Sequence, residues 1–293
     1  MNNILKYIAL SLFVIGFYSC ESNLMDEEHY KKVIYLKSSD NNIFTYSHPF
    51  NDSITTGYVT VGSGGSMPLD KDVTVSIDTN IMVLNEYNYR NFDLNYDKYA
   101  RMLDKSRYSF PSKEIVIKAG NINAATFFPV EVDVNGLSPD STYMIPLKIN
   151  AISDYEVNPE KDFVLYTISL KNKYSEDGLN IYKMKGSKQP EGGNISAVTT
   201  TKKLLPLSSN KLRMFPENII NSTSLEDIED KTFVVIVNDD NTLKLKSYKN
   251  LKIEQLENCY YDSELEIFNL NYKYRLPNNN VWIFVKEILT RVK

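Results

Sequence analysis

The sequence predicts an all-β protein with two domains, a β-sandwich followed by an antiparallel β-barrel. The chain has 293 residues, enough for about two domains of roughly 150 residues each. From Val33 onward, short alternating or continuous apolar runs are separated by Gly, Pro, Asn and Asp, as in sandwiches and barrels. Hydrophobic residues make up 42% of the chain and charged residues 24%, a composition typical of a globular protein.

The first 20 residues have the pattern of a secretion signal. Lys6 precedes an apolar run of about ten residues, and the small Ser19 precedes Cys20. The run is shorter than the roughly 20 residues that a transmembrane helix needs. A signal that ends at Cys resembles a bacterial lipoprotein signal, which implies that Cys20 is acylated and becomes the new N-terminus. The alternative is an ordinary signal cleaved elsewhere, with a free Cys20.

Residues 21–30 form an acidic tether that contains Glu21, Asp26, Glu27 and Glu28. An acidic segment at this place resembles the surface-export signal of Bacteroidetes lipoproteins. The resemblance implies a protein that is lipid-anchored in the outer membrane and faces the cell exterior.

Charge and rare residue types exclude several classes of protein. Lys and Arg number 33 against 37 Asp and Glu, a formal net charge of −4, and no run is rich in Lys and Arg. This balance argues against nucleic acid as a partner and against electrostatic attraction to anionic lipid. Only two His and two Cys are present, which argues against a His-based triad, a His-rich zinc site or an internal disulfide framework. We therefore expect no metal and no cofactor.

Seven strands are expected in the first domain, which predicts a sandwich. In one strand Val73, Val75 and Ile77 alternate with polar residues, as expected where one face is buried. The expected strands are residues 32–37, 57–61, 72–78, 114–118, 126–134, 144–150 and 163–170.

Residues 85–110 are dense in Tyr and Asn. A connection of this length is usually functional or partly helical. Tyr87, Tyr89, Tyr96 and Tyr99 are expected either to form a stacking surface or to pack this crossover onto the sandwich.

Residues 172–180 show no alternation and are the expected linker. The boundary is placed near Ser175, with the first domain at residues 31–174 and the second at 175–293. Eight strands are expected in the second domain, at residues 181–185, 197–204, 211–215, 232–238, 242–247, 251–257, 264–275 and 281–289.

The last two expected strands indicate the shape of the second domain. Over residues 268–276, apolar and aromatic residues alternate with Asn, Lys and Arg, as in a half-solvated strand. In the final strand, Trp282 and Phe284 lie on the face opposite the aliphatic residues. Long antiparallel strands joined by hairpins favour a lipocalin-like barrel, with a second β-sandwich as the alternative.

Two stretches carry a family resemblance. The segment VNGLSPDSTYMIPLKI at residues 134–149, with flanking matches at 118–120, 155–158 and 172–174, resembles the N-terminal domain of unknown function of Bacteroidetes surface lipoproteins. That domain is Ig-like and precedes an endo-β-N-acetylglucosaminidase barrel in some members. The segments LNYKYR and VWIFVKE, which begin at Leu270 and Val281, resemble the lipocalin-like domain of unknown function that is often attached to it.

The resemblance implies an Ig-like sandwich at residues 31–174 and a protein of polysaccharide-utilisation loci. Such a protein is displayed beside an outer-membrane transporter and glycosidases, which are its implied partners. The resemblance carries over no catalytic residue.

The residues do not favour an enzyme. A glycosidase needs two carboxylates at a fixed separation, whereas the acidic runs 226–230 and 262–266 lie at expected strand edges, where a solvated face explains them. The chain after residue 175 is too short for a (β/α)₈ barrel. His29 lies in the tether and His48 beside Pro49 in an expected loop, so neither is a suitable general base.

The preferred function is therefore non-catalytic carbohydrate binding. Aromatic rings stack on the C–H faces of sugars, and the expected platform is Trp282 with Tyr260, Tyr261 and Phe284, flanked by Asn279. The alternative for Trp282, the only Trp, is a place in the core. A second hypothesis is a structural or interaction subunit, or an adhesin that binds a protein partner. A third, a small hydrophobic ligand, requires a barrel with an apolar interior.

Overall fold

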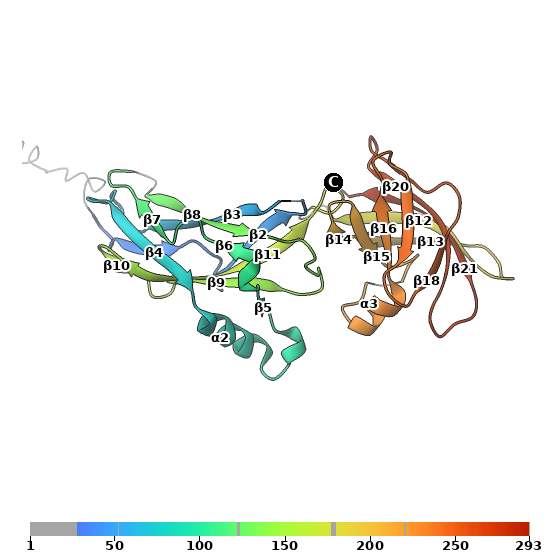
Figure 1. Ribbon diagram of the computed structural model, residues 1–293, viewed down its shortest axis with the longest axis horizontal. Coiled ribbons are helices and arrows are strands. Elements are labelled where there is room, and N and C mark those ends of the chain that lie inside the picture. Colours follow the sequence, from blue (N-terminus) through green and yellow to red (C-terminus); the bar gives the residue numbers. More distant parts are fainter. Residues whose placement is uncertain (1–27, 52, 122–123, 177–179, 220, 293) are drawn as a thin grey trace, which may run out of the picture.

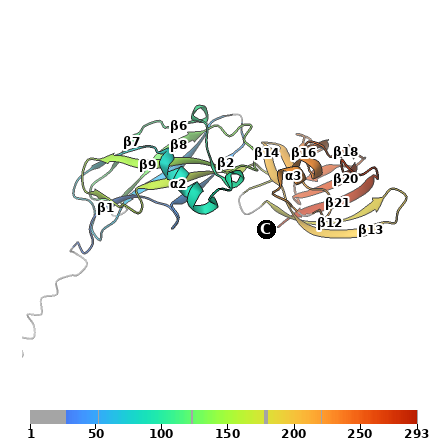
Figure 2. The same ribbon diagram turned by 90° about the horizontal axis from the view of Figure 1, so that it is seen from below.

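The computed structural model describes residues 28–292 except 52, 122–123, 177–179 and 220. Cys20 and residues 21–27 of the expected tether lie outside the described residues. The two β domains follow one another along the long axis of the molecule, as Figures 1 and 2 show. Within the described chain, no helix is long and apolar enough to cross a membrane.

The first domain consists of two β-sheets. One sheet has the strand order β10-β1-β3-β8-β6, and the other has the order β2-β11-β9-β4-β7, with β5 paired to β9. The strands are β1 (Val33–Leu36), β2 (Ile43–Pro49), β3 (Thr55–Ser63), β4 (Val73–Thr79), β5 (Arg101–Met102), β6 (Tyr108–Ser109), β7 (Glu114–Ile117), β8 (Ala125–Val132), β9 (Tyr143–Ile152), β10 (Glu156–Val157) and β11 (Phe163–Lys171).

The core of the first domain lies between these two sheets. Val73, Val75 and Ile77 of β4 are fully buried, and they pack with apolar residues of the opposite sheet such as Val59 and Phe128. Alternation along the strands puts one face of each sheet into this core. The predicted β-sandwich is thus confirmed.

One expectation for the first domain is wrong. His48 was expected in a loop, but it lies on β2, which pairs in parallel with β11, and it is fully buried. The strand is hard to find in the sequence because polar Thr45 and Ser47 alternate with Phe44, Tyr46 and His48, and because it ends at Pro49. Pairing with a strand far along the chain, which no local pattern encodes, stabilises it.

The Tyr- and Asn-rich crossover is partly helical. It comprises α2 (Ile81–Phe92), the 3₁₀ turn η2 (Tyr96–Lys98), strand β5, and a second 3₁₀ turn, η3 (Lys105–Arg107). The side chain of Asn80 accepts a hydrogen bond from the Met82 amide and so caps α2. Asn88 bonds both the amide and the carbonyl of Ala100, at 2.9 and 2.8 Å, and this holds the helix against the returning chain.

The second domain contains a six-stranded and a four-stranded sheet. Their orders are β13-β12-β21-β20-β18, with β19 paired to β20, and β14-β15-β16-β17. The elements are β12 (Ile181–Pro190), β13 (Ser196–Lys203), β14 (Leu205–Ser208), β15 (Lys211–Met214), α3 (Leu225–Lys231), β16 (Phe233–Val237), β17 (Leu243–Ser247), β18 (Lys252–Gln255), β19 (Tyr260–Asp262), β20 (Ile267–Arg275) and β21 (Ile283–Arg291).

The two sheets curl into the halves of one barrel. Only Leu204 separates β13 from β14, so a single bent strand passes from one half into the other. On the opposite side, the Gln255 side chain bonds the Leu245 amide and the Leu243 carbonyl, both at 2.8 Å, and links β18 to β17. Successive strands are therefore neighbours, and β21 returns to pair with β12, as expected for the up-and-down order of a lipocalin-like barrel.

The barrel interior is filled by aromatic rings and an ion network. The rings of Tyr261 and Phe268 lie 4.6 Å apart. Farther along, Lys202 Nζ lies 2.5 Å from a Glu287 carboxylate oxygen, and the Tyr272 hydroxyl donates to the other Glu287 oxygen at 2.8 Å. This interior differs from the apolar one that the hypothesis of a small hydrophobic ligand required.

Candidate functional site

The structure does not bring the expected aromatic platform together. Tyr261 is 3% exposed and belongs to the barrel core. Tyr260 is exposed and pairs with Asn269 near the start of β20, whereas Trp282 precedes Ile283, the partner of Tyr274 near the end of that strand. At about 3.4 Å per residue, roughly 20 Å separate Tyr260 from Trp282.

Trp282, Phe284 and Asn279 remain near one another at the end of the β20–β21 hairpin. Lys273 Nζ lies 4.6 Å from the centre of the Trp282 ring, and the Arg275 guanidinium lies 5.1 Å from it. The Asn279 side-chain oxygen accepts a hydrogen bond from the Val281 amide at 2.9 Å. Two cations therefore occupy the Trp282 ring surface that stacking on a sugar would require.

A larger site, absent from the sequence-based predictions, lies between the two domains. It is a cleft of about 970 Å³, which is at the upper end of the range for small-molecule sites. Its lining comes from the crossover, from the 138–143 segment, from α3 and from the loop after β17. The lining residues are Phe92, Asn95, Asp97, Lys98, Tyr99, Arg101, Ser138, Asp140, Ser141, Thr142, Tyr143, Thr223, Ser224, Leu225, Glu226, Ile228, Glu229 and Tyr248.

One wall of the cleft carries a row of aromatic rings. Phe92 and Tyr99 line the cleft, with their ring centroids 6.4 Å apart. Tyr87 and Tyr96 are not among the lining residues but continue the row at its two ends, 6.1 Å from Phe92 and 5.1 Å from Tyr99. The Tyr99 hydroxyl donates to the Asp93 carbonyl at 2.6 Å, which fixes the orientation of its ring. The density of Tyr between residues 85 and 110 was the signal in the sequence for this wall.

The base of the cleft joins the two domains. Arg213 of β15 donates hydrogen bonds from both terminal nitrogens to the two carboxylate oxygens of Asp140, which lies in the first domain. The Arg213 side chain is only 2% exposed, and its guanidinium lies 5.0 Å from the Tyr248 ring. This bidentate pair therefore ties β15, and the Tyr248 ring beside it, to the first domain.

The polar lining suits a ligand rich in hydroxyl groups. Ser141, Thr142 and Thr223 provide hydroxyls, and Glu226 and Glu229 of α3 provide carboxylates that accept hydrogen bonds. Aromatic faces beside planar acceptors are the chemistry that sugars need. In the part of the chain that the structure describes, no three His, Cys, Asp or Glu side chains are grouped so that they could hold a metal.

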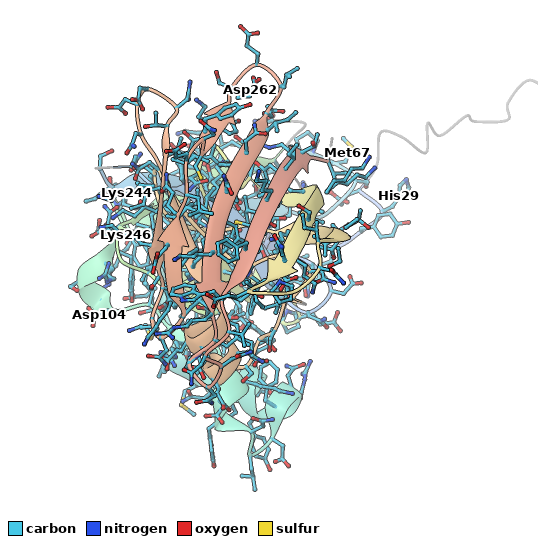
Figure 3. The ribbon with its side chains drawn as sticks, turned by 90° about the vertical axis from the view of Figure 1, so that its right-hand side faces the viewer. His29, Met67, Asp104, Lys244, Lys246 and Asp262 are labelled. Carbon is cyan, nitrogen blue, oxygen red and sulfur yellow. The ribbon has the colours of Figure 1, made fainter. Side chains whose placement is uncertain are left out.

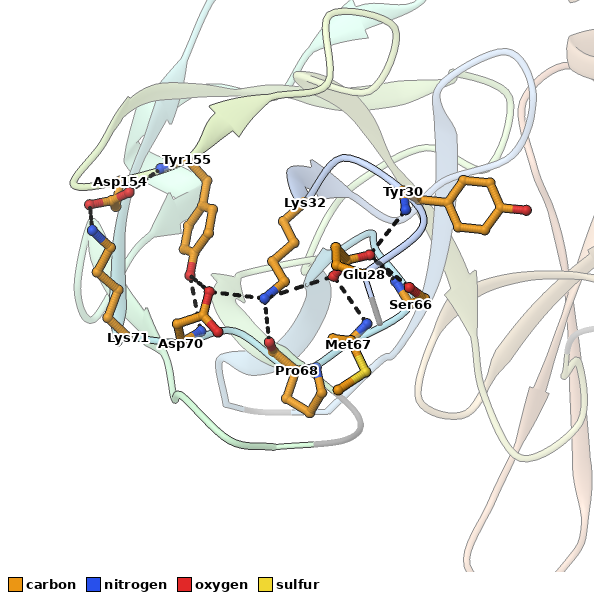
Figure 4. A network of polar contacts seen from close by, with 10 residues as sticks. All are labelled: Glu28, Tyr30, Lys32, Ser66, Met67, Pro68, Asp70, Lys71, Asp154 and Tyr155. Carbon is orange, nitrogen blue, oxygen red and sulfur yellow. Dashed lines mark hydrogen bonds and ion pairs between the residues drawn. The ribbon is translucent and has the colours of Figure 1, made fainter. Parts of the chain in front are cut away.

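A second hollow, of about 680 Å³, lies at the N-terminal end of the first domain (Figure 4). The Glu28 carboxylate accepts hydrogen bonds from the backbone amides of Ser66 and Met67 at 2.6 and 3.1 Å. These backbone bonds hold the pKa of Glu28 at about 2. Lys32 reaches Asp70 at 3.0 Å and Glu28 at 3.8 Å. The charged side chains of this hollow form ion pairs with one another, so their role is to fix the start of the described chain on the sandwich.

The fold and the interdomain cleft define a two-domain β protein with a ligand-sized site at the domain junction. A family model described as an N-terminal domain matches residues 30–156, and a model described as C-terminal matches residues 162–290. Together they cover most of the chain, which therefore belongs to the family of two-domain proteins that these models describe. The predicted resemblance to Bacteroidetes proteins of this architecture is confirmed.

Solved structures with the same fold come from Bacteroides. A protein of unknown function from Bacteroides ovatus is 16% identical with a TM-score of 0.65, and 88% of this chain and 94% of that chain are covered. An auxiliary nutrient binding protein from Bacteroides thetaiotaomicron is 14% identical with a TM-score of 0.57, and the covered shares are 87% and 92%. At these identities the likeness shows the fold alone. No curated protein matches the sequence.

Proposed function

We propose that this protein is a non-catalytic carbohydrate-binding protein that holds an oligosaccharide in the interdomain cleft. The observation that carries the proposal is the pair of aromatic rings, Phe92 and Tyr99, that lines a cleft of about 970 Å³ together with hydroxyl and carboxylate groups. A nutrient-binding protein with the same fold supports it. An open cleft with few buried polar anchors suits weak, releasable capture.

The proposal includes attachment to the outer membrane through a lipid at Cys20, with the protein facing outward within a polysaccharide-utilisation system. The described chain starts at the end of the first domain that is remote from the second domain (Figure 1). A chain attached there would present the cleft and the barrel away from the membrane, where a transporter and glycosidases work.

A protein-binding role is the second candidate function. Five large apolar side chains on and after α2 are between 43% and 67% exposed: Ile81, Met82, Tyr89, Leu94 and Tyr96. A cluster of this kind on a surface helix is a favourable patch for a protein partner. It would make the protein an adhesin or a subunit of a surface complex.

The test of the proposed function is a glycan-array and affinity-gel screen of the protein made without residues 1–20. Replacing an aromatic contact usually removes about 0.5–1.5 kcal/mol, so Tyr99→Ala should weaken retention by one glycan class by about two- to thirteenfold. Tyr30→Ala, at a Tyr that is 72% exposed at the far end of the first domain, is the matched control and should bind normally.

Two results would contradict the proposal. Equal retention by Tyr99→Ala and the unaltered protein would remove the cleft from carbohydrate binding. Failure to bind any glycan, with a folded protein by circular dichroism, would favour the protein-binding role.

A further inference from the structure

The outer, solvent-exposed face of the barrel sheet formed by β12, β21 and β20 is a second candidate binding surface, apart from the interdomain cleft. It lies at the end of the molecule opposite the first domain, and Figure 3 views the molecule from that end. Residues alternate strictly between this face and the core, because Val285, Glu287 and Leu289 are buried while Phe284, Lys286 and Ile288 are exposed.

This face is basic although the chain as a whole carries a net charge of −4. Only two acidic side chains, Glu254 and Asp262, lie on the outward positions of its strands. Seven basic residues lie on outward positions of the same strands, namely Lys183, Lys185, Lys203, Lys252, Lys273, Arg275 and Lys286.

The central cations of the face are not neutralised within the protein. Lys273 pairs with Glu254 at 2.8 Å. By contrast, Lys183, Lys185 and Lys286 are exposed and form no ion pair with any residue that the structure describes. An anion bound here would therefore meet cations that no carboxylate of the described chain neutralises.

The strand register arranges these lysines around a shallow groove of about 540 Å³. Lys185, Ile288 and Asn269 lie in one row across β12, β21 and β20, and Tyr260 of β19 extends this row. Ser187, Lys286 and Asn271 form the next row. Lys185 and Lys286 are therefore diagonal neighbours, about 7–8 Å apart at their backbones.

We propose that this face binds an anionic polysaccharide, one that carries uronate carboxylates or sulfate esters. The two lysines would pair with anionic groups of successive sugars, Asn269 and Asn271 would bond hydroxyls, and the exposed Tyr260 ring would stack on a sugar face. That the ligand is a carbohydrate rests on the proposed function, but this binding surface on β12, β21 and β20 is separate from the interdomain cleft.

Other polyanions fit the surface less well. A double-stranded nucleic acid carries one charge per about 1.7 Å and is held by many phosphate contacts, whereas the groove is lined by two basic residues, Lys185 and Lys286. The face points away from the end at which the described chain begins (Figure 1), which disfavours a membrane. Binding to DNA and to lipid vesicles is therefore measured as an alternative outcome of the test.

The test measures binding of polygalacturonate, heparin and neutral dextran by affinity-gel electrophoresis and calorimetry. Lys185→Gln/Lys286→Gln should weaken binding of one acidic polysaccharide about tenfold, because it removes two exposed ion pairs with the ligand. Lys244→Gln/Lys246→Gln changes the charge equally on exposed positions of β17 (Figure 3) and should change binding less than twofold. The affinity for the acidic polysaccharide should also fall steeply as the salt concentration rises from about 0.05 M to about 0.5 M, because salt screens exposed ion pairs.

Trp282, the only Trp, lies four residues before Lys286 and against Lys273 and Arg275 of the same face, so a polysaccharide long enough to extend from the groove along β21 would change its fluorescence. The acidic polysaccharide should shift its fluorescence in the unaltered protein and in Tyr99→Ala alike. If Tyr99→Ala no longer binds neutral glycans but still binds the acidic polysaccharide, both the cleft and the barrel face are binding sites. If binding is lost only in Lys185→Gln/Lys286→Gln, the barrel face is a binding site and the cleft is not. Equal losses in the two lysine pairs, or equal affinity for DNA or phosphatidylglycerol vesicles, would overturn the proposal.

Discussion

His48 is a buried histidine whose surroundings keep it neutral. Its Nδ1 lies 2.7 Å from the Thr55 hydroxyl and its Nε2 lies 2.7 Å from the Tyr166 hydroxyl. Burial, helped by the charge of Lys171, lowers its pKa from 6.5 to about 4. The imidazole is therefore a hydrogen-bonding part of the sandwich core, held between two partners with no access to a ligand.

This shift predicts a pH dependence of stability. The unfolded chain binds the His48 proton more tightly than the folded one, so the stabilisation is complete above pH 6.5 and is lost as the pH falls through about 4. The expected loss is about 3 kcal/mol. Urea denaturation from pH 7 to pH 4 measures it, and His48→Gln, which keeps bonding groups without titrating, should remove this part of the profile. Identical profiles for the two proteins would contradict the prediction.

At the scale of the strands, Lys202 of β13 and Glu287 of β21 form a buried ion pair in the barrel interior. Lys202 and Glu287 are 2% and 0% exposed at their side chains, and the Lys202 ammonium also donates to the Phe215 carbonyl at 2.8 Å. Burial lowers the pKa of Lys202 and raises that of Glu287, and their contact opposes both shifts. Each buried charge is compensated by the other, so the loss of one residue leaves an uncompensated charge in the barrel interior.

Removing one member should be costly and removing both much less so. Lys202→Met leaves the Glu287 carboxylate buried without its partner, so we expect a loss of about 3–5 kcal/mol in the free energy of unfolding. Lys202→Met/Glu287→Leu should recover most of that loss. Lys203→Met, at the exposed neighbouring position, is the control and should change stability by less than about 0.5 kcal/mol. A loss in the double variant as large as in the single variant would refute this account of the pair.

For the whole molecule, a small set of contacts at the junction sets the relation between the domains. Beside the pair of Arg213 and Asp140, the Asn172 amide donates to the Ser208 and Lys211 carbonyls at 2.7 and 3.2 Å. These contacts hold the wall of aromatic rings and α3 on opposite sides of the cleft.

Asp140→Asn should therefore loosen the junction and weaken ligand binding in the cleft. It leaves the Arg213 guanidinium nearly buried without a counter-charge, at a cost of about 3 kcal/mol or more. We expect a lower Tm for the second domain and a longer maximum dimension by small-angle scattering. Asp133→Asn removes a half-exposed partner of Arg107 and should change stability by less than about 1 kcal/mol. Unchanged scattering and unchanged glycan retention in Asp140→Asn would show that other contacts hold the domains.

The sequence by itself determined the all-β class and the location of many strands. Alternation is a local property: the pattern over residues 268–276 requires a strand with one buried face wherever that strand lies. Val73, Val75 and Ile77 likewise predicted a buried strand face and occupy one. The predicted domain boundary near Ser175, the lipidation of Cys20 and the surface location remain predictions.

Only the tertiary structure decided which distant residues meet. Tyr260 and Tyr261 are neighbours in the chain, and the pairing of β19 with β20 decides that Tyr261 faces the core and Tyr260 the solvent. Asp140 and Arg213 meet although 73 positions separate them, and Asp140 lines the cleft. Local patterns report which face of an element is buried, whereas a site between domains depends on long-range packing that no single segment encodes.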